Sequence, residues 1–129
     1  MAATLELTEA NFEDTLKKGG ILFIDFWAAW CGPCRAFAPT FESAATRHAD
    51  ITFAKVDTEA QQGLAQAFEI RSIPTLAIFR DGILLGQNPG ALPPDAFDKV
   101  IEQVRGIDMD KVKAEVAAAR AKQEAGAKS

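Results

Sequence analysis

Blocks of apolar and polar residues predict that strands and helices alternate along this 129-residue chain. The segment Ile21–Trp27 is apolar on both faces except for Asp25, which is typical of a central strand that is covered on both sides. Before it, Thr4–Leu7 alternates as a short strand does, and Thr8 is a good N-cap for a helix that would end at Gly19.

The rest of the chain continues this alternation and adds a hairpin. Asp81 and Gly82 are typical of a two-residue turn between antiparallel strands. Asn88-Pro89-Gly90 is expected to break the second of these strands. The remaining elements expected are a helix after Cys34 with Phe37, Phe41, Ala44 and Ala45 inward, strands over Ile51–Val56, Thr75–Phe79 and Ile83–Leu85, a helix over Gln61–Phe68, and a helix opened by Pro93-Pro94 that buries Phe97, Val100, Ile101 and Val104. The order β-α-β-α-β-α-β-β-α predicts an α/β fold with a central mixed β-sheet flanked by helices.

The composition changes after Gly106, where Ala, Lys and Glu predominate as far as Lys128. We expect residues 1–106 to form one domain and residues 107–129 to add a C-terminal helical extension, with a thin apolar line through Met109, Val112 and Val116. Two interpretations of this helix stay open: it docks loosely on its own domain, or it binds a partner.

The length and the net charge of the chain limit the classes of protein to which it can belong. A chain of this length can bury a core without disulfide staples. The formal net charge of −4 argues against nucleic acid or an anionic membrane surface as a partner. The N-terminus has no basic start, and no apolar run approaches the ~20 residues of a membrane helix, so neither a signal peptide nor a membrane span is expected. We therefore expect a cytoplasmic protein, in which a close cysteine pair is more often catalytic or metal-binding than structural.

Both cysteines of the chain lie in Trp30-Cys31-Gly32-Pro33-Cys34, between the apolar strand and the next helix. On a helix, Cα atoms at i and i+3 are about 5 Å apart, within the ~4.4–6.8 Å range of a disulfide. In a strand the same spacing would be about 10 Å, which is out of reach. Gly32 lets the chain turn, and Pro33 suits the first helical turn. The pair therefore predicts a dithiol that opens and closes with little backbone movement.

The two sulfur atoms are expected to differ. Cys31 would lie at the helix N-terminus, where unpaired N–H groups and the helix dipole favour a thiolate, so it is the predicted nucleophile. Cys34 lies one turn further along, and we expect it to be more buried and to act as the resolving thiol. In the predicted cycle, Cys31 attacks a partner disulfide, and Cys34 then releases the reduced partner from the mixed disulfide.

Metal and haem sites fit this pattern less well. Structural zinc needs four ligands, and the chain offers two cysteines and one histidine, His48, which we expect to be solvated. Arg35 follows Cys34 where c-type haem attachment requires histidine. An iron–sulfur cluster would need cysteines from two chains. No bound metal is expected.

Asp25 is the second candidate for chemistry. A carboxylate in an apolar strand loses its hydration, so the pKa of Asp25 is expected to rise. It is either a structural buried acid, paired with Lys55 on a neighbouring strand, or a proton acceptor for Cys34 during resolution. From the residues alone these two interpretations stand equal.

Several separate motifs together resemble the thioredoxin family. The matching segments are Asp25–Cys34, Pro39, Lys55-Val56-Asp57, Ile73-Pro74-Thr75 and Gly90-Ala91-Leu92, and they span residues 5–106. The resemblance implies a thioredoxin fold and a protein-disulfide reductase that maintains cell redox homeostasis. It also implies a monomer with no bound cofactor, which receives electrons from NADPH through a thioredoxin reductase and passes them to client proteins with disulfides.

The resemblance further implies roles for particular residues. Asp25 would be the proton acceptor, and Lys55 would tune it. Ile73–Pro74 would be a cis peptide that faces the dithiol, and a client segment would pair with the Ile73 backbone as an added strand. Trp27 would pack beneath the site. The docking surface would consist of Trp30, Gly32, Pro33, Ile73, Pro74, Gly90 and Ala91.

Three features depart from the usual family pattern: Ala29 replaces a polar residue, Ser72 replaces a glycine, and the chain continues after Gly106. They put the choice of clients in doubt, but not the dithiol chemistry. Two other functions stay open. One is a disulfide oxidant or isomerase on the same fold, and the other is a binding module in which the thiols are secondary.

Overall fold

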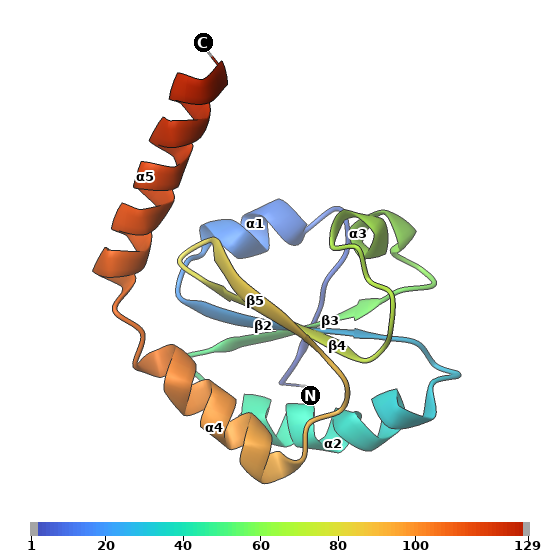
Figure 1. The fold of residues 1–129 in the computed structure, drawn as a ribbon. Coiled ribbons are helices and arrows are strands. Elements are labelled where there is room, and N and C mark those ends of the chain that lie inside the picture. The colour runs from blue at the N-terminus through green and yellow to red at the C-terminus, as the bar shows by residue number, and fades with distance from the viewer. Residues whose placement is uncertain (1–2, 128–129) are drawn as a thin grey trace.

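The computed structural model describes residues 3–127, so Lys128, the last residue of the expected C-terminal helix, lies outside the described part. A five-stranded sheet in the order β1-β3-β2-β4-β5 forms the centre, and helices cover both of its faces (Figure 1). Strands β1, β2 and β3 are parallel, whereas β4 runs antiparallel to β2, and β5 antiparallel to β4. The elements are β1 (Leu5–Glu6), α1 (Phe12–Lys17), β2 (Ile21–Trp27), α2 (Gly32–Arg47), β3 (Thr52–Asp57), α3 (Gln62–Ala67), β4 (Thr75–Arg80), β5 (Ile83–Pro89), α4 (Pro94–Arg105) and α5 (Met109–Ala127). The expected mixed sheet and element order are confirmed.

The two faces of the sheet hold separate cores because successive side chains of a strand point to opposite sides. Helices α2 and α4 cover one face, and α1 and α3 cover the other (Figure 1). Phe23 of β2 packs on the α2/α4 side, whereas Ile24 and Phe26 pack on the α1/α3 side. The buried interior of β2 confirms the central strand that its apolar sequence predicts.

The expected N-cap of α1 is wrong. The helix begins at Phe12 with Asn11 at the N-cap position, and Thr8 lies outside it. The Thr8 N–H donates to Asn11 Oδ1 at 2.8 Å, and the Asn11 N–H donates to Thr8 Oγ1 at 3.3 Å. These side chains thus close a local turn, an arrangement that competes with helix for residues of this type.

The expected hairpin turn is confirmed, and the second hairpin strand ends within Asn88-Pro89-Gly90 as expected but extends beyond the expected Leu85. Asp81 and Gly82 both have positive φ, of 54° and 80°, as the tight hairpin turn requires. Strand β5 then continues to Pro89, which is opposite Thr75. An edge strand such as β5 can accommodate Pro89, because alternate N–H groups of such a strand point away from the sheet. Gly90, which follows the strand, has a positive φ of 104°.

Helix α5 leaves the domain beside the end of α4 and projects away from it (Figure 1). Only its first turns are covered: Met109 is buried and Val112 and Val116 are half-buried, whereas every side chain from Ala117 to Gly126 is exposed. The Lys113 ammonium pairs with the Asp81 carboxylate at 3.3 Å. The helix is therefore attached at its base and is not docked along its length.

Candidate functional site

The two cysteines lie at the start of α2, shortly after the end of β2. Cys31 occupies the N-cap position of α2, and Pro33 lies in its first turn. Cys31 and Cys34 are joined by a disulfide, and their Cα atoms are 5.2 Å apart. The i, i+3 spacing therefore places the sulfur atoms together as the sequence predicts.

The two cysteines differ in their backbone contacts and hardly in their exposure. Cys31 is 4 % exposed and Cys34 is 3 % exposed, so the expected contrast in burial is absent. The Cys34 N–H donates to the Cys31 sulfur at 3.1 Å, and this sulfur lies 3.7 Å from the Ile73 carbonyl oxygen. An N–H group directed at a sulfur atom favours its thiolate, so the helix N-terminus distinguishes Cys31 from Cys34.

A second loop faces the disulfide. The Ile73–Pro74 peptide bond is cis, as the resemblance implies, and Ile73 packs against the cluster that contains both cysteines. The Gly90 N–H donates to the Pro74 carbonyl at 2.8 Å, which brings Gly90 and the exposed Ala91 to this side of the molecule. The Ile73–Pro74 loop thus lies against the disulfide, and Gly90 is hydrogen-bonded to that loop.

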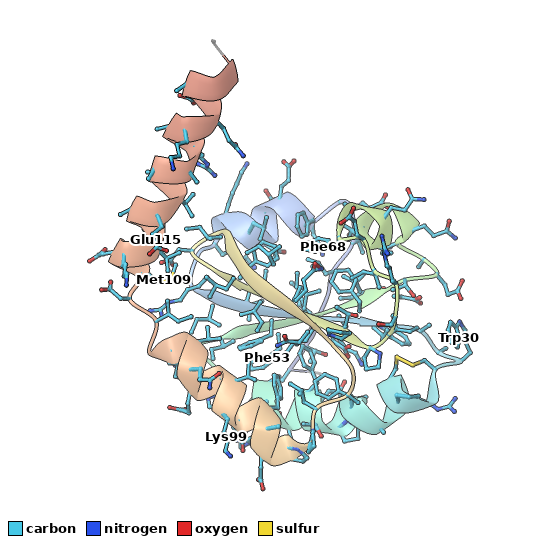
Figure 2. All side chains as sticks on the ribbon, viewed as in Figure 1. Trp30, Phe53, Phe68, Lys99, Met109 and Glu115 are labelled. Carbon is cyan, nitrogen blue, oxygen red and sulfur yellow. A yellow bond between two sulfur atoms is a disulfide. The ribbon has the colours of Figure 1, made fainter. Side chains whose placement is uncertain are left out.

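Two tryptophans flank the disulfide in different ways. Trp27 packs against the cysteine cluster, which confirms its expected place beneath the site. Trp30 is 67 % exposed and lies beside the disulfide at the end of the molecule (Figure 2). Its indole N–H donates to the Glu59 carboxylate at 2.7 Å. Sequence reasoning missed Glu59, because nothing in the local pattern links it to a tryptophan 29 residues earlier.

Asp25 is fully buried under α2. Its side chain shares a sheet face with Phe23, which belongs to the core cluster under α2 and α4, and with Trp27, which packs against the cysteine cluster. Both carboxylate oxygens lack a hydrogen-bond partner in the described part of the chain. Burial raises the pKa of Asp25 from 3.8 to about 7, and the nearby Lys55 charge opposes the rise. The expected direction of the shift is confirmed.

One of the two interpretations of Asp25, a structural acid paired with Lys55, does not fit the structure. The two residues are register partners on β2 and β3, but both oxygens of Asp25 are unpaired. The Lys55 ammonium lies 5.1 Å from the Trp27 ring centroid and 3.9 Å from Glu42 Oε1. A long lysine stem carries its charge past a short neighbouring aspartate toward water. The ammonium therefore acts on Asp25 only at a distance.

Beside Lys55 the surface is hollowed. A groove of about 500 Å³ is lined by Thr4, Leu5, Glu6, Trp27, Lys55 and Asp57. The groove opens the Lys55 side of β3 to solvent. Lys55 therefore lies close to water, whereas Asp25 is fully buried.

The described residues hold no group of three or more His, Cys, Asp or Glu side chains placed for a metal ion. His48 is half-buried and not solvated as expected, because its Nδ1 lies 3.0 Å from the Arg105 guanidinium. No helix in residues 3–127 is both long enough and apolar enough to cross a membrane. A buried disulfide between two cysteines of one helix N-terminus defines the site as that of a thiol–disulfide oxidoreductase.

Comparisons with known proteins agree. The thioredoxin family model matches residues 3–103. The "Putative thioredoxin 2" of Streptomyces coelicolor is 52 % identical over 117 residues, which are 91 % of this chain and 87 % of that protein. The thioredoxin of Alicyclobacillus acidocaldarius is 40 % identical and covers 79 % of this chain and 98 % of its own length. Thioredoxin f from spinach chloroplast superposes with a TM-score of 0.70 at 29 % identity, over 81 % of this chain and 92 % of that one. The chain belongs to the thioredoxin family.

Proposed function

We propose that this chain is a protein-disulfide reductase in which Cys31 is the nucleophile and Cys34 is the resolving thiol. The observation that carries the proposal is the place of the Cys31 sulfur at the N-terminus of α2, beside the Cys34 N–H and the Ile73 carbonyl. The N–H favours a thiolate, and the carbonyl belongs to backbone on which an extended client segment could pair.

In the proposed cycle, the Cys31 thiolate attacks one sulfur of a client disulfide, and the other client sulfur leaves as a thiolate. The Cys34 thiolate then attacks the Cys31 sulfur, and the second client sulfur leaves in turn. Two electrons pass from the dithiol to the client, which ends as a dithiol, while Cys31 and Cys34 form the disulfide.

Asp25 would accept the proton of Cys34 when the mixed disulfide is resolved. Support comes from its place on the β2 face under α2 and from a pKa of about 7, which is suited to exchanging a proton near neutral pH. Lys55 would tune this base, because its positive charge favours the carboxylate. Gly32 and Pro33 would set the helix start that brings the two sulfurs together.

Clients would dock on the exposed surface around the disulfide. An extended segment would add a strand along the Ile73 backbone, and the flat ring of Trp30 would contact its side chains. Gly90 would let the client backbone approach closely, because it has no side chain. The proposed surface consists of Trp30, Gly32, Pro33, Ile73, Pro74, Gly90 and Ala91.

A reductase must be reduced again after each cycle. We propose that electrons come from NADPH through a thioredoxin reductase, and that the chain acts as a monomer in the cytoplasm on proteins that form a disulfide in each turnover. The family membership supports a reductase and disulfide clients as partners.

The reduction potential of the Cys31/Cys34 couple tests the direction of electron flow. The protein is equilibrated in thiol–disulfide buffers of known ratio, and the free thiols are counted. We expect a value near or below the cytosolic glutathione poise, about −220 to −320 mV. A value of about −120 to −180 mV would contradict the proposal and indicate an oxidant or isomerase. Biological activity retained by a Cys31→Ser, Cys34→Ser double variant would indicate a binding module instead.

A further inference from the structure

Lys55 is held by groups other than Asp25. Its ammonium lies 3.9 Å from Glu42 Oε1 and 5.1 Å from the Trp27 ring centroid. Asp25 is the register partner of Lys55 on β2, yet in the described chain neither of its carboxylate oxygens has a hydrogen-bond partner. The cation nearest to the buried carboxyl is therefore directed elsewhere.

Glu42 stands at the boundary between this site and water. It belongs to α2, as Cys34 does, and directly follows the core residue Phe41. The Glu42 side chain is 51 % exposed, whereas that of Lys55 is 20 % exposed. One helix thus carries both the predicted resolving thiol and the carboxylate that contacts Lys55.

We infer that Glu42 is a positioning residue, which holds the Lys55 ammonium at the solvent boundary and keeps it from forming an ion pair with Asp25. Such a pair would keep Asp25 ionised and make it a weaker base. The functional consequence of this inference rests on the proposed role of Asp25 as proton acceptor.

Few charged groups surround Asp25. The α2/α4 core face around it is otherwise apolar or sulfur-containing, and two further acids, Glu6 and Asp57, line the groove beside Lys55. On β3 the charged group that faces Asp25 is Lys55, and the acids around this lysine are Glu42 of α2, Glu6 of β1 and Asp57 of β3. The other elements contribute apolar or sulfur-containing side chains: Leu76 and Ile78 from β4, Phe97, Ile101 and Val104 from α4, and Cys34, Phe37 and Phe41 from α2.

Removal of the Glu42 carboxylate leaves Lys55 free to turn toward the unpaired carboxyl. Its attraction would then lower the pH at which Asp25 ionises. Because the Glu42–Lys55 contact is partly exposed, we expect a shift of about half a pH unit.

The test is a carbon-13 NMR titration of the Asp25 carboxyl between pH 4 and pH 10. The oxidised protein is used because its cysteines do not titrate. Glu42→Gln is expected to lower the Asp25 midpoint by about half a unit. Glu13→Gln, on α1 across the sheet, removes the same charge and is expected to leave the midpoint unchanged. In a Lys55→Met background, which keeps the apolar stem, Glu42→Gln is expected to have no further effect.

Two results would overturn the inference. One is an unchanged Asp25 midpoint in Glu42→Gln. The other is an equal shift of the midpoint with and without Lys55, which would mean that the Glu42 charge acts on Asp25 directly and not through Lys55.

A parallel measurement separates this inference from the proposed function. The rate at which Cys34 resolves a mixed disulfide is followed against pH in the wild type and in Glu42→Gln. If the NMR midpoint shifts and the kinetic profile does not, Glu42 positions Lys55 as inferred, and the proposed role of Asp25 is wrong.

Discussion

Two aspartates near opposite ends of β2 have pKa values shifted in opposite directions. At the dithiol end, burial without a partner raises the pKa of Asp25 to about 7. At the other end, Asp50 accepts two hydrogen bonds from the Arg105 guanidinium, at 2.7 and 3.0 Å, and these hold its pKa at about 2. One aspartate is left ready to exchange a proton near pH 7, and the other stays ionised at any ordinary pH.

The same contrast extends to the neighbouring groups. Beside Asp50, the Arg80 guanidinium donates to the carbonyls of Val104, Arg105 and Ile107, which caps the end of α4. That end of the molecule satisfies its polar groups with one another, and α5 leaves from it, far from Trp30 (Figure 2). The dithiol end instead keeps a disulfide, an unpaired acid and an exposed tryptophan. Polar groups thus stabilise the fold at one end and remain available for chemistry at the other.

The largest expected effect comes from breaking the dithiol. Cys31→Ser should reduce the rate of client disulfide reduction to background, because the remaining Cys34 thiol lacks the N–H contact that favours the Cys31 thiolate and has no second thiol with which to complete the exchange. Cys34→Ser should also stop turnover, but it should accumulate a covalent Cys31–client complex. Non-reducing gel electrophoresis with a disulfide-containing client distinguishes the two variants. A covalent complex in Cys31→Ser but not in Cys34→Ser would reverse the assigned roles.

The second prediction concerns stability against pH. Between about pH 4 and pH 7 the folded protein keeps a proton on Asp25 that the unfolded chain releases, so this group lowers the free energy of unfolding as the pH rises. Asp25→Asn removes this dependence. Relative to the wild type, the variant should gain about 3 kcal/mol in unfolding free energy between pH 5 and pH 9. Urea unfolding of the oxidised proteins at both pH values measures the gain.

Asp50→Asn is the matched control for that measurement. The folded-state pKa of Asp50 is lowered, so its contribution is present above about pH 4 and is lost as the pH falls through 2. The variant should be less stable than the wild type by the same amount at pH 5 and at pH 9. If both variants changed in parallel with pH, the contrast between the two ends of β2 would be wrong.

The third prediction is kinetic. Asp25→Asn should slow resolution of the mixed disulfide by about 10²-fold near neutral pH, because Cys34 loses its proton acceptor, while the attack by Cys31 changes little. Rapid mixing with a fluorescent client separates formation of the mixed disulfide from its release. Equal release rates in the variant and the wild type would leave Asp25 with a structural role only.

These predictions depend on contacts that differ in how well the sequence predicts them. The Cys31–Cys34 disulfide follows from spacing along one helix start, and β2 follows from its apolar run, because both are local patterns. The Trp30–Glu59 and Lys55–Glu42 contacts join side chains of different elements, and local spacing carries no signal for them. The Asp25–Lys55 pair, one of the two interpretations of Asp25, does not form for the same reason: the sequence predicts neighbouring strands, but not where the ammonium of a flexible lysine lies. Thr8 shows that a local pattern can also mislead: its residue type is typical of an N-cap, but it forms a turn with Asn11 instead.

The smallest expected effect is at the far end of α5. Deletion of residues 117–129 removes side chains that are exposed as far as position 126, so the unfolding free energy should change by less than about 0.5 kcal/mol. Deletion from Ile107 onward also removes the buried Met109 and one carbonyl acceptor of Arg80, and should cost about 3 kcal/mol. Neither deletion touches the dithiol, so both proteins should reduce a disulfide client at the wild-type rate at 25 °C. A slower rate in the shorter deletion, with its stability unchanged, would mean that α5 takes part in client contact and that the two ends of the molecule do not act independently.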